Sequence, residues 1–256
     1  MKTSHARLVQ TLSALAVVAV AAAAGHAACR IRQSVELARQ SEPLQAAPPG
    51  STASLLIVGD STGVGTGASS AGNSVVGLIA RDHPRLKMVN RAADGAKFAD
   101  MPRQFGGEER FDMVLVLAGG NDVIRLTGAD ALARDIGRAA ELARAQGRQV
   151  VFMRPGNVGN APFFFPPLSW LMTQRSKTLH RLVRETAAGG GEAMVYVSLY
   201  KDNADDPFAQ RPDELNAADG LHPSDAGYRI WYDTLSSRAG LAGRLAALRR
   251  PPLTNP

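Results

Sequence analysis

Five short apolar runs, each separated from the next by a stretch of helical pattern, constrain the fold more than any other feature of the chain. The runs are SLLIVG from Ser54, LKMVNRA from Leu86, DMVLVLAGG from Asp112, QVVFMRPG from Gln149 and MVYVSLY from Met194. Hydrophobic residues at consecutive positions are typical of strands buried on both faces of a parallel sheet. Helical patterns follow over residues 66–82, 97–105, 129–146, 168–188 and 224–247. This alternation predicts a three-layer α/β/α sandwich around a five-stranded, mostly parallel sheet with right-handed crossovers.

The loops that follow the strands indicate where a ligand would bind. In an open parallel sheet, ligands lie at the carboxyl ends of the strands. The loops beginning at Gly59, Ala92, Gly119 and Pro155 are therefore expected to share one rim of the sheet.

The first 28 residues differ from the rest of the chain. A short basic stretch, MKTSHAR, precedes the uncharged, alanine-rich run LVQTLSALAVVAVAAAAGHAA. This pattern predicts a secretory signal peptide or an N-terminal membrane anchor, and thus an exported, periplasmic protein that contacts the membrane through this segment. The run is barely long enough to span a bilayer, which takes ~20 apolar residues.

Three further segments follow this leader. Small residues from Gly25 to Ala28 would allow cleavage, and Cys29 stands where a lipoprotein cysteine would stand, although His26 replaces the usual leucine. Residues 29–52 are expected to form a short helical piece and a linker with proline and glycine. The main domain is expected over 53–247 and a C-terminal tail over 248–256.

Composition excludes several classes of partner and site. Apolar residues make up 45% of the 256 residues and charged residues 20%, which fits a globular core. The formal net charge of +6 includes Lys2 and Arg7 of the leader, and the remaining arginines are scattered over helix faces. Because no basic cluster interleaves with aromatic residues, no nucleic-acid partner is expected. The single cysteine excludes an internal disulfide and a cysteine-based metal site.

The stretch LLIVGDSTGVGTGA, residues 55–68, has three interpretations: a glycine-rich loop that binds a nucleotide phosphate, a nucleophile on a tight turn, or an ordinary loop. The glycines follow a GxGxG spacing rather than GxGxxG, and Arg91 with two alanines stands where a ribose-binding acid would be needed. GDSTG also fits the GxSxG nucleophile elbow of α/β-hydrolases, but that elbow follows a mid-sheet strand, whereas Ser61 follows the first strand. The pattern favours Ser61 as a nucleophile at the rim.

A serine nucleophile needs a base and a group that orients the base. Of the histidines outside the leader, His83 is expected at a solvated helix end and His180 at a surface or half-buried position in a helix. His222 lies in DGLHPSDAGY, three residues after Asp219, so this carboxylate can accept Nδ1–H of His222 and leave Nε2 free for Ser61. A helix-capping aspartate beside a surface histidine would give the same spacing.

Two further residues could stabilise an oxyanion. Asn121, in LAGGND, follows a buried strand, and its side-chain amide is a donor suited to acyl transfer. Gly95, in NRAADGAKF, offers a backbone N–H on the same rim. Both residues also fit plain turns.

These blocks together resemble the SGNH (GDSL-type) hydrolases. The resemblance rests on GDST at 59–62, Asn90 with Gly95, GGND at 119–122 and DGLH at 219–222, and it spans about 54–240. It implies a flavodoxin-like fold with Ser61 as nucleophile, His222 as base and Asp219 as its orienting acid. It also implies an oxyanion hole made by the backbone N–H groups of Ser61 and Gly95 and the Asn121 amide, with no metal or organic cofactor. Thr62 departs from the family, which has leucine there.

The function implied is that of an exported serine esterase or lipase-like hydrolase that cleaves carboxylic esters or thioesters. The substrate would be a small-molecule, lipid or glycan ester. Alternatives are an O-deacetylase or acyltransferase acting on envelope polysaccharide, and a non-catalytic carbohydrate-binding scaffold of the same fold. The sequence leaves the oligomeric state open.

Two long loops have open interpretations. Phe163, Phe164, Phe165 and Trp170 lie in RPGNVGNAPFFFPPLSWLM, where they could form a substrate wall, enter a bilayer beside the anchor, or pack in the core. In the loop before Asp219, the acids Asp202, Asp205 and Asp206 are expected to be solvated. Because no set of histidines has ligand spacing, no metal site is expected.

Overall fold

The computed structural model describes residue 21 and residues 23–248. A single five-stranded sheet has the order β2-β1-β3-β4-β5, and all its neighbouring strands are parallel. The strands are β1 (Ala53–Gly59), β2 (Leu86–Asn90), β3 (Phe111–Leu117), β4 (Gly147–Arg154) and β5 (Met194–Ser198). This is the flavodoxin-like order. The predicted fold class is confirmed, and the carboxyl ends of all five strands share one edge.

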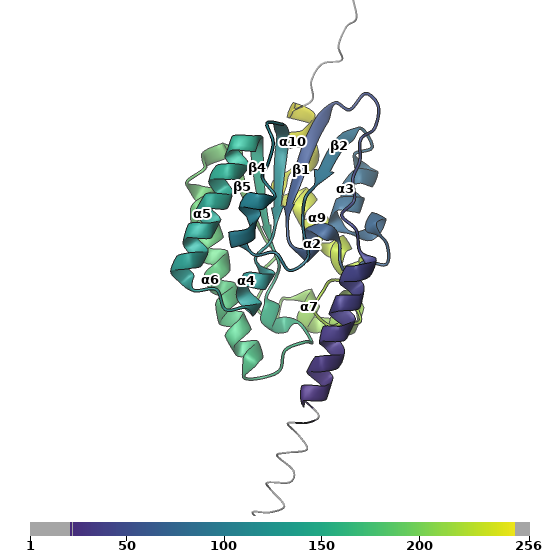
Figure 1. The fold of residues 1–256 in the computed structure, drawn as a ribbon, viewed down its shortest axis with the longest axis vertical. Helices are drawn as coiled ribbons and strands as arrows, with labels where there is room; N and C mark the ends of the chain where they lie inside the picture. Colours follow the sequence, from purple (N-terminus) through teal and green to yellow (C-terminus); the bar gives the residue numbers. More distant parts are fainter. Residues whose placement is uncertain (1–20, 22, 249–256) are drawn as a thin grey trace, which may run out of the picture.

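Helices cover both faces of the sheet (Figure 1). One face carries α3 (Val75–Asp82), α9 (Asp225–Ala239) and α10 (Leu241–Leu248), and the other carries α5 (Ala129–Gln146), α6 (Leu168–Ala188) and the 3₁₀ helix η2 (Phe98–Arg103). The shorter elements are α2 (Ser61–Val64), α4 (Gly120–Ile124), α7 (Pro207–Gln210), α8 (Pro212–Leu215), η1 (Ala71–Asn73), η3 (Val158–Asn160) and η4 (Gly191–Ala193).

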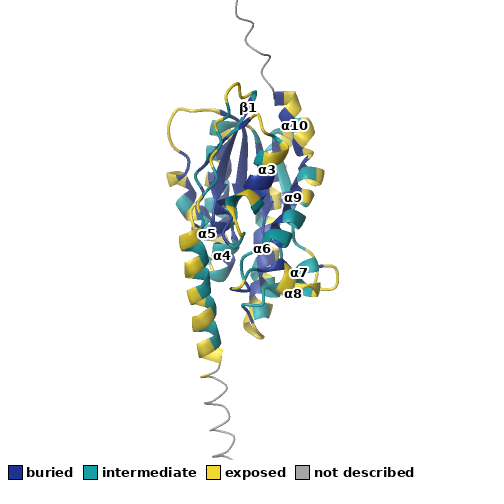
Figure 2. Cartoon of the chain, turned by 90° about the vertical axis from the view of Figure 1, so that its right-hand side faces the viewer, coloured by how far each residue is buried: buried dark blue, intermediate teal, exposed yellow. Residues whose placement is uncertain are grey.

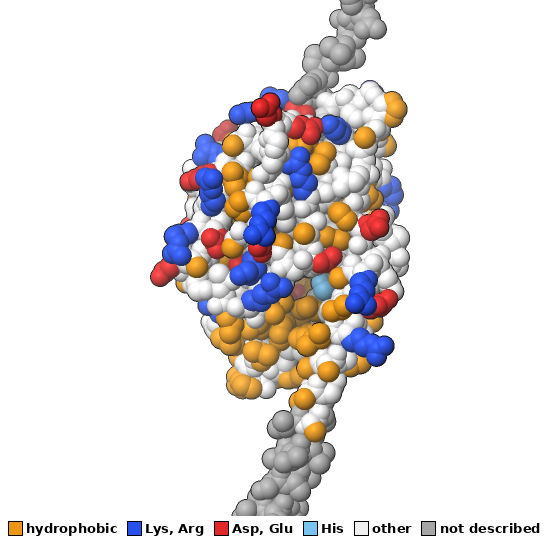
Figure 3. All heavy atoms as spheres, in the orientation of Figure 1, with side chains coloured by type: hydrophobic (Ala, Val, Ile, Leu, Met, Phe, Trp, Pro, Cys, Tyr) orange, Lys and Arg blue, Asp and Glu red, His pale blue; other side chains and the backbone are white. Residues whose placement is uncertain are grey.

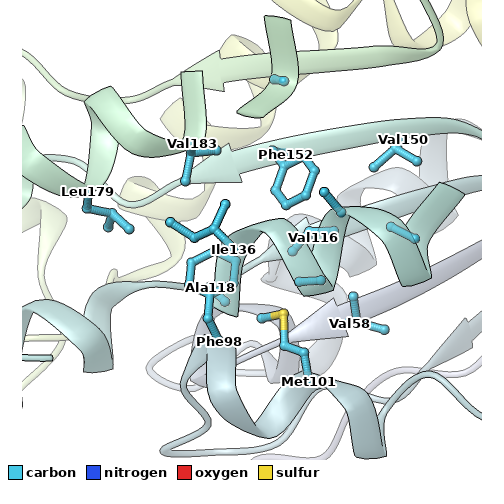
Figure 4. Close-up of a cluster of buried hydrophobic side chains, with 14 of the residues drawn as sticks. Val58, Phe98, Met101, Val116, Ala118, Ile136, Val150, Phe152, Leu179 and Val183 are labelled. Atoms are coloured by element: carbon cyan, nitrogen blue, oxygen red, sulfur yellow. The ribbon is translucent and has the colours of Figure 1, made fainter. Parts of the chain in front are cut away.

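Two buried hydrophobic clusters, one on each face, hold the three layers together. The cluster beneath α5 and α6 includes Val116, Ile136, Phe152 and Leu179, which Figure 4 shows between sheet and helices. Figure 2 shows the sheet as the buried centre of the molecule. The rows of consecutive apolar residues on β1, β3 and β4 exist because both faces of these strands are covered.

Helix boundaries differ from the expected ones where glycine and proline interrupt the pattern. The helix expected over 66–82 begins only at Val75, since Gly65 and Gly67 adopt φ of +97°. The stretch 97–105 is a 3₁₀ helix with Pro102 inside it. The last helix breaks at Gly240, whose φ of +57° ends α9 before α10 begins.

The segment before β1 contacts the domain. Residues 23–40 form a helix at the lower end of the molecule, and beyond it Ala46 pairs with Met88 of β2 in an antiparallel bridge (Figure 1). No residue of this helix, called the N-terminal helix below, is fully buried. Within the described part of the chain, no helix is both long and apolar enough to cross a membrane. Most of the expected leader and residues 249–256 of the expected tail lie outside the described residues, and the division of the chain remains a prediction.

Candidate active site

The nucleophile turn links β1 to α2 at the carboxyl edge of the sheet. The backbone N–H of Asp60 donates to the carbonyl of Leu117 (2.8 Å), which fixes the turn against β3. The Asp60 carboxylate then caps α2, accepting hydrogen bonds from the backbone N–H (2.9 Å) and the hydroxyl (2.7 Å) of Thr62. Ser61 is the first residue of α2 and is 8% exposed. The turn therefore presents one serine hydroxyl at the rim.

Two glycines make this turn possible. Gly59 has φ of +151°, and a Cβ there would lie 1.8 Å from the carbonyl oxygen of Leu117. Gly67 has φ of +97°, and a Cβ there would lie 2.8 Å from Cβ of His222. The glycines therefore allow the close approach of the serine turn to β3 and to the histidine loop, and no phosphate cradle is needed to explain them.

The structure brings Ser61, His222 and Asp219 together. Nε2 of His222 lies 3.0 Å from the Ser61 hydroxyl, and Nδ1 of His222 lies 2.6 Å from Oδ2 of Asp219. The carboxylate of Asp219 is fully buried, while the His222 side chain is 13% exposed. This is the geometry of an acid that orients an imidazole toward a nucleophile.

The hydrogen bonds to Asp219 keep it ionised. Its Oδ1 accepts the backbone N–H groups of Leu221 (3.0 Å) and His222 (3.1 Å), so the loop wraps around its own carboxylate. Burial alone would raise the pKa of Asp219, but the hydrogen bond and charge of His222, with further hydrogen bonds from Ser34 and Leu221, lower this pKa to about 2. The carboxylate is thus negative at neutral pH and can hold Nδ1–H of His222.

Of the expected oxyanion donors, Asn121 lines the cavity beside Ser61, and Gly95 is not among its lining residues. Asn121, in α4, lines the same cavity as Ser61 and His222, and its amide also donates to the carbonyl of Ala96 (3.2 Å). Gly95 follows β2 with φ of +74° and is not among the residues that line this cavity. Their part in an oxyanion hole remains a prediction.

Two buried amide side chains, Gln104 and Asn90, hold the backbone of the nucleophile turn. The Gln104 side chain accepts from the backbone N–H of Gly59 (2.7 Å) and donates to its carbonyl (2.8 Å), as a neighbouring strand would. Asn90, at the end of β2, donates to the carbonyl of Gly63 (2.8 Å) and accepts from the N–H of Ala92. In the sequence, Asn90 stood out only because it precedes Gly95 in the block NRAADG. No sequence motif indicated a role for Gln104.

A buried ionic group also lies under the rim. Arg154, at the end of β4, is fully buried, donates to the carbonyl of Val116 (2.8 Å) and lies over the ring of Phe98 at 4.9 Å. Burial lowers the pKa of Arg154 to about 10, and the charge of Asp60 opposes this shift. Burial raises the pKa of Asp60 above its usual value, and the hydrogen bonds from Thr62 and the charge of Arg154 offset only part of that rise. Arg154 and Asp60 thus each reduce the effect of burial on the other.

A cavity opens beside Ser61 and combines apolar and polar walls. Ile124, Val158 and Leu221 supply apolar surface, and Asn157, Asp206 and Asn216 supply polar groups. Asp206 is 3% exposed, caps α7 and accepts from the Asn160 amide (2.7 Å), so it is not the solvated loop acid that was expected. In the described part of the chain, no three or more His, Cys, Asp or Glu side chains are grouped so as to hold a metal ion.

The four loop aromatics, for which a substrate wall, a bilayer contact and core packing were left open, are not among the residues that line this cavity. Phe164 is buried in the core cluster, and Phe163 packs against that cluster with its ring 4.9 Å from that of Phe164. Phe165 and Trp170 are 56% and 67% exposed. Earlier residues of the same loop, among them Asn157 and Ala161, line the cavity instead. The N–H of Phe163 donates to the carbonyl of Gly220 (3.0 Å), which ties the loop to the segment between Asp219 and His222.

His180 also differs from its expected surface or half-buried position. It is 7% exposed, with Nε2 2.8 Å from the carbonyl of Pro155 and Nδ1 within hydrogen-bond distance of the Tyr196 hydroxyl. Burial lowers the pKa of His180 to about 4, so the imidazole is neutral at neutral pH. It is a structural residue under the end of β4, which leaves His222 as the histidine that faces Ser61.

Comparison with solved structures supports the fold. The chain is similar to the acetylxylan esterase Axe2 from Geobacillus stearothermophilus, with 22% identity over 75% of this chain and 95% of that one and a TM-score of 0.52. It is also similar to the lipase/acylhydrolase from Enterococcus faecalis, with 22% identity over 79% and 100% of the two chains and a TM-score of 0.57. The lipase Lip_vut3 from the goat rumen metagenome gives a TM-score of 0.59 with 16% identity over 73% and 97%.

Comparison of the sequence with known families and proteins gives the assignment. A search of curated protein sequences found no match. The model of the GDSL-like lipase/acylhydrolase family matches residues 57–230, which include Ser61, Asn121 and His222. The match spans more than half of the chain and agrees with the resemblance found in the motifs. The chain belongs to the GDSL-like lipase/acylhydrolase family and is a hydrolase of ester bonds.

Proposed function

We propose that this protein is an exported serine esterase that cleaves carboxylic esters or thioesters with Ser61 as its nucleophile. The observation that carries the proposal is the continuous relay from the Ser61 hydroxyl through His222 to the buried Asp219, with contacts of 3.0 and 2.6 Å. A serine hydroxyl is a weak nucleophile until an adjacent base accepts its proton. This relay supplies such a base and the acid that orients it.

The reaction then proceeds in two halves. The Ser61 oxygen attacks the acyl carbon as its proton passes to Nε2 of His222, and the tetrahedral intermediate collapses when this proton moves to the leaving alcohol or thiol. Water then gives a proton to His222 and attacks the acyl-enzyme, which releases the acid and restores the Ser61 hydroxyl. Asp219 stays ionised throughout and stabilises the imidazolium.

The negative oxygen of each intermediate needs donors. We assign this role to the backbone N–H groups of Ser61 and Gly95 and to the Asn121 amide. Ser61 opens α2, where N–H groups lack partners within the helix. Asn121 lines the cavity with Ser61, which supports its part in the oxyanion hole.

A second candidate is removal of acyl groups from a polysaccharide. Asn157, Asp206 and Asn216 lie along the cavity that adjoins Ser61, and such polar groups suit a hydroxylated leaving group better than a long alkyl chain. Axe2, whose fold is similar, is an acetylxylan esterase. Relative kcat/KM for acetylated oligosaccharides and for nitrophenyl esters of increasing chain length separates this candidate from a lipase-like role.

We also propose that the protein works at a membrane surface. The large apolar side chains that are exposed in the described part of the chain lie in the N-terminal helix, just after α4, and in or just before the first turn of α6: Ile31, Val35, Leu126, Phe165, Leu168, Trp170 and Leu171. Figure 3 shows apolar side chains gathered at the end of the molecule where this helix lies. The ring of His26 contacts that of Phe165 at 5.3 Å, which joins the helix to this apolar end.

The uncharged run over residues 8–28 supports a lipid bilayer as the partner of this apolar end. It leads into the N-terminal helix, so anchoring of the run would bring Phe165 and Trp170 to the membrane surface. Exposed apolar patches of this kind mark protein or membrane interaction sites.

The two tryptophans of the chain make this contact measurable. Trp170 is 67% exposed and Trp231 is 6% exposed, so quenching by brominated lipids distinguishes them. The full chain in vesicles should lose Trp170 fluorescence to bromolipid, and Trp170→Phe, which retains Trp231, should remove that loss. Vesicle-bound protein whose Trp170 is not quenched would contradict the membrane contact.

The catalytic proposal is tested with nitrophenyl acetate and the full chain. Ser61→Ala should reduce hydrolysis by more than a thousandfold while circular dichroism stays unchanged. Ser51→Ala is the matched control, since the exposed Ser51 hydroxyl bonds the nearby carbonyl of Pro48 in the segment before β1. A Ser61→Ala variant that retains wild-type turnover would refute the assignment of the nucleophile.

A further inference from the structure

The N-terminal helix contacts the loop that carries Asp219. The Ser34 hydroxyl donates to Oδ2 of Asp219 (2.6 Å), and Nη1 of Arg30, one turn earlier, donates to the carbonyl of Ala218 (2.5 Å). Figure 1 shows this helix at the lower end of the molecule. Ser34 lies upstream of residues 57–230, which the family model matches, so it is outside the part of the chain shared with that family.

Gly220 of the same loop lies next to the Arg30 guanidinium. Its φ of +65° favours glycine, and a Cβ on it would lie 2.8 Å from Nη1 of Arg30. A side chain at position 220 would therefore also require the guanidinium that bonds Ala218 to shift. Arg30 thus lies close against the loop between Asp219 and His222.

Ser34 completes the hydrogen bonding of the acid. An ionised carboxylate has about four acceptor positions. Oδ1 of Asp219 accepts hydrogen bonds from two backbone N–H groups of its own loop, and Oδ2 accepts one from Nδ1 of His222. The fourth donor, the Ser34 hydroxyl, comes from a different segment and bonds the same oxygen as His222. Rotation of the carboxylate away from His222 would break the Ser34 bond as well.

We propose that Ser34 is a positioning residue for the catalytic triad, and that the N-terminal helix is therefore part of the active site rather than a tether. This inference rests on the proposed esterase function. The Ser34 hydroxyl holds Oδ2 of Asp219 toward Nδ1 of His222. Burial of Asp219 is complete, which a helix at this position helps to maintain.

A positioning role of Ser34 should change kcat without a comparable change in KM or in the stability of the fold. No residue of the helix is fully buried, so loss of one hydroxyl should cost little packing. A hydrogen bond to a charged group is among the stronger ones in proteins, so Ser34→Ala should lower kcat about tenfold and leave KM within about twofold. Ser34→Thr keeps the hydroxyl and should recover most of the lost kcat.

The experiment uses the full chain and counts active sites. Labelling the protein to completion with a fluorophosphonate gives the number of reactive serines. The kcat is then expressed per active site even if part of a preparation is misfolded. Ser41→Ala is the matched control, because the Ser41 hydroxyl bonds the carbonyl of Leu37 within the N-terminal segment (2.8 Å). Proton NMR of the low-field Nδ1–H of His222 adds a readout of the bond to Asp219. This signal should shift in Ser34→Ala and stay in place in Ser41→Ala.

The outcomes separate the two proposals. An active wild type whose Ser34→Ala variant keeps both full kcat and an unshifted low-field proton would overturn the role of Ser34 and leave the esterase function standing. A wild type that hydrolyses no acyl ester would overturn the esterase function and, with it, the role of Ser34. If Ser34→Ala yields too few competent sites, Ser34→Cys, which retains size and a weak donor, should show an intermediate kcat, and full kcat in that variant would count against the proposal.

Discussion

The hydroxyl oxygen of Ser61 lies 3.0 Å from Nε2 of His222, although 161 residues separate them in the chain. The contact exists because β1 and the loop before α9 end at the same edge of the sheet. Gly67 lets the two loops approach, since a Cβ there would lie 2.8 Å from Cβ of His222. The site thus results from the parallel sheet, which places both loops at one edge, and from Gly59 and Gly67, which allow their close approach.

Replacement of Asn121 tests the oxyanion hole. Asn121→Ala should lower kcat by about 10²–10³-fold with KM little changed, because the amide would bind charge that develops only in the transition state. Steady-state kinetics with a soluble acetate ester measure this effect. Asn73→Ala, which removes an amide bonded to Ser69 and Asp225 away from the cavity, is the control. Equal kcat in the Asn121→Ala variant and the wild type would exclude Asn121 as a donor.

His180 should make stability fall as pH decreases. Burial lowers its pKa to about 4, against an unfolded value of 6.5, so between these limits the unfolded chain binds a proton that the native protein does not. Stability is therefore fully present above pH 6.5 and is lost as pH falls toward 4, by about 3 kcal/mol in total.

This effect is isolated by comparing the wild type with His180→Gln. Other groups also titrate, so the difference between the two unfolding curves is the relevant quantity. Denaturant titrations at intervals from pH 7 to pH 4 should show a difference that shrinks by about 3 kcal/mol toward pH 4. Parallel stability curves for the two proteins would show that His180 is not buried in the neutral form.

Replacing glycine by alanine should have opposite effects on stability at Gly59, in the nucleophile turn, and at Gly137, within a helix. Gly59→Ala should destabilise the fold by several kcal/mol, because its Cβ would lie 1.8 Å from the Leu117 carbonyl oxygen. Gly137 lies within α5 with nothing within 4 Å of a built Cβ, so Gly137→Ala should stabilise by about 0.5–1 kcal/mol. Thermal unfolding of both variants measures the contrast. Similar melting temperatures for the two would be inconsistent with the turn described.

The sheet was predictable from sequence because buried parallel strands need apolar residues at successive positions. Residues such as Val114 to Leu117 leave no polar face, and all five strands were found at or within a few residues of their expected positions. Ser61, His222 and Asp219 were predictable because the histidine and its acid are close in the chain. Helix ends were less certain, since Gly65 and Gly240 interrupt an otherwise helical pattern.

The residues that sequence reasoning missed act through contacts between distant segments. Ser34 lies 185 residues from Asp219, and Gln104 bonds the backbone of Gly59 across 45 residues. Neither forms a motif, because a single polar residue on a helix face is an ordinary surface feature until the fold shows its partner. The aromatic loop was ambiguous for the related reason that Phe164 and Trp170 share a pattern but have opposite exposure.

The assignment of Ser61 as the nucleophile is tested most directly by labelling the full-length protein with a fluorophosphonate and mapping the adduct by mass spectrometry. We expect one adduct, on Ser61, whose formation is abolished by Ser61→Ala and slowed by at least a hundredfold in His222→Ala, with ester hydrolysis lost in parallel. An unlabelled Ser61 in a protein that still hydrolyses esters, or full hydrolysis by Ser61→Ala, would contradict it.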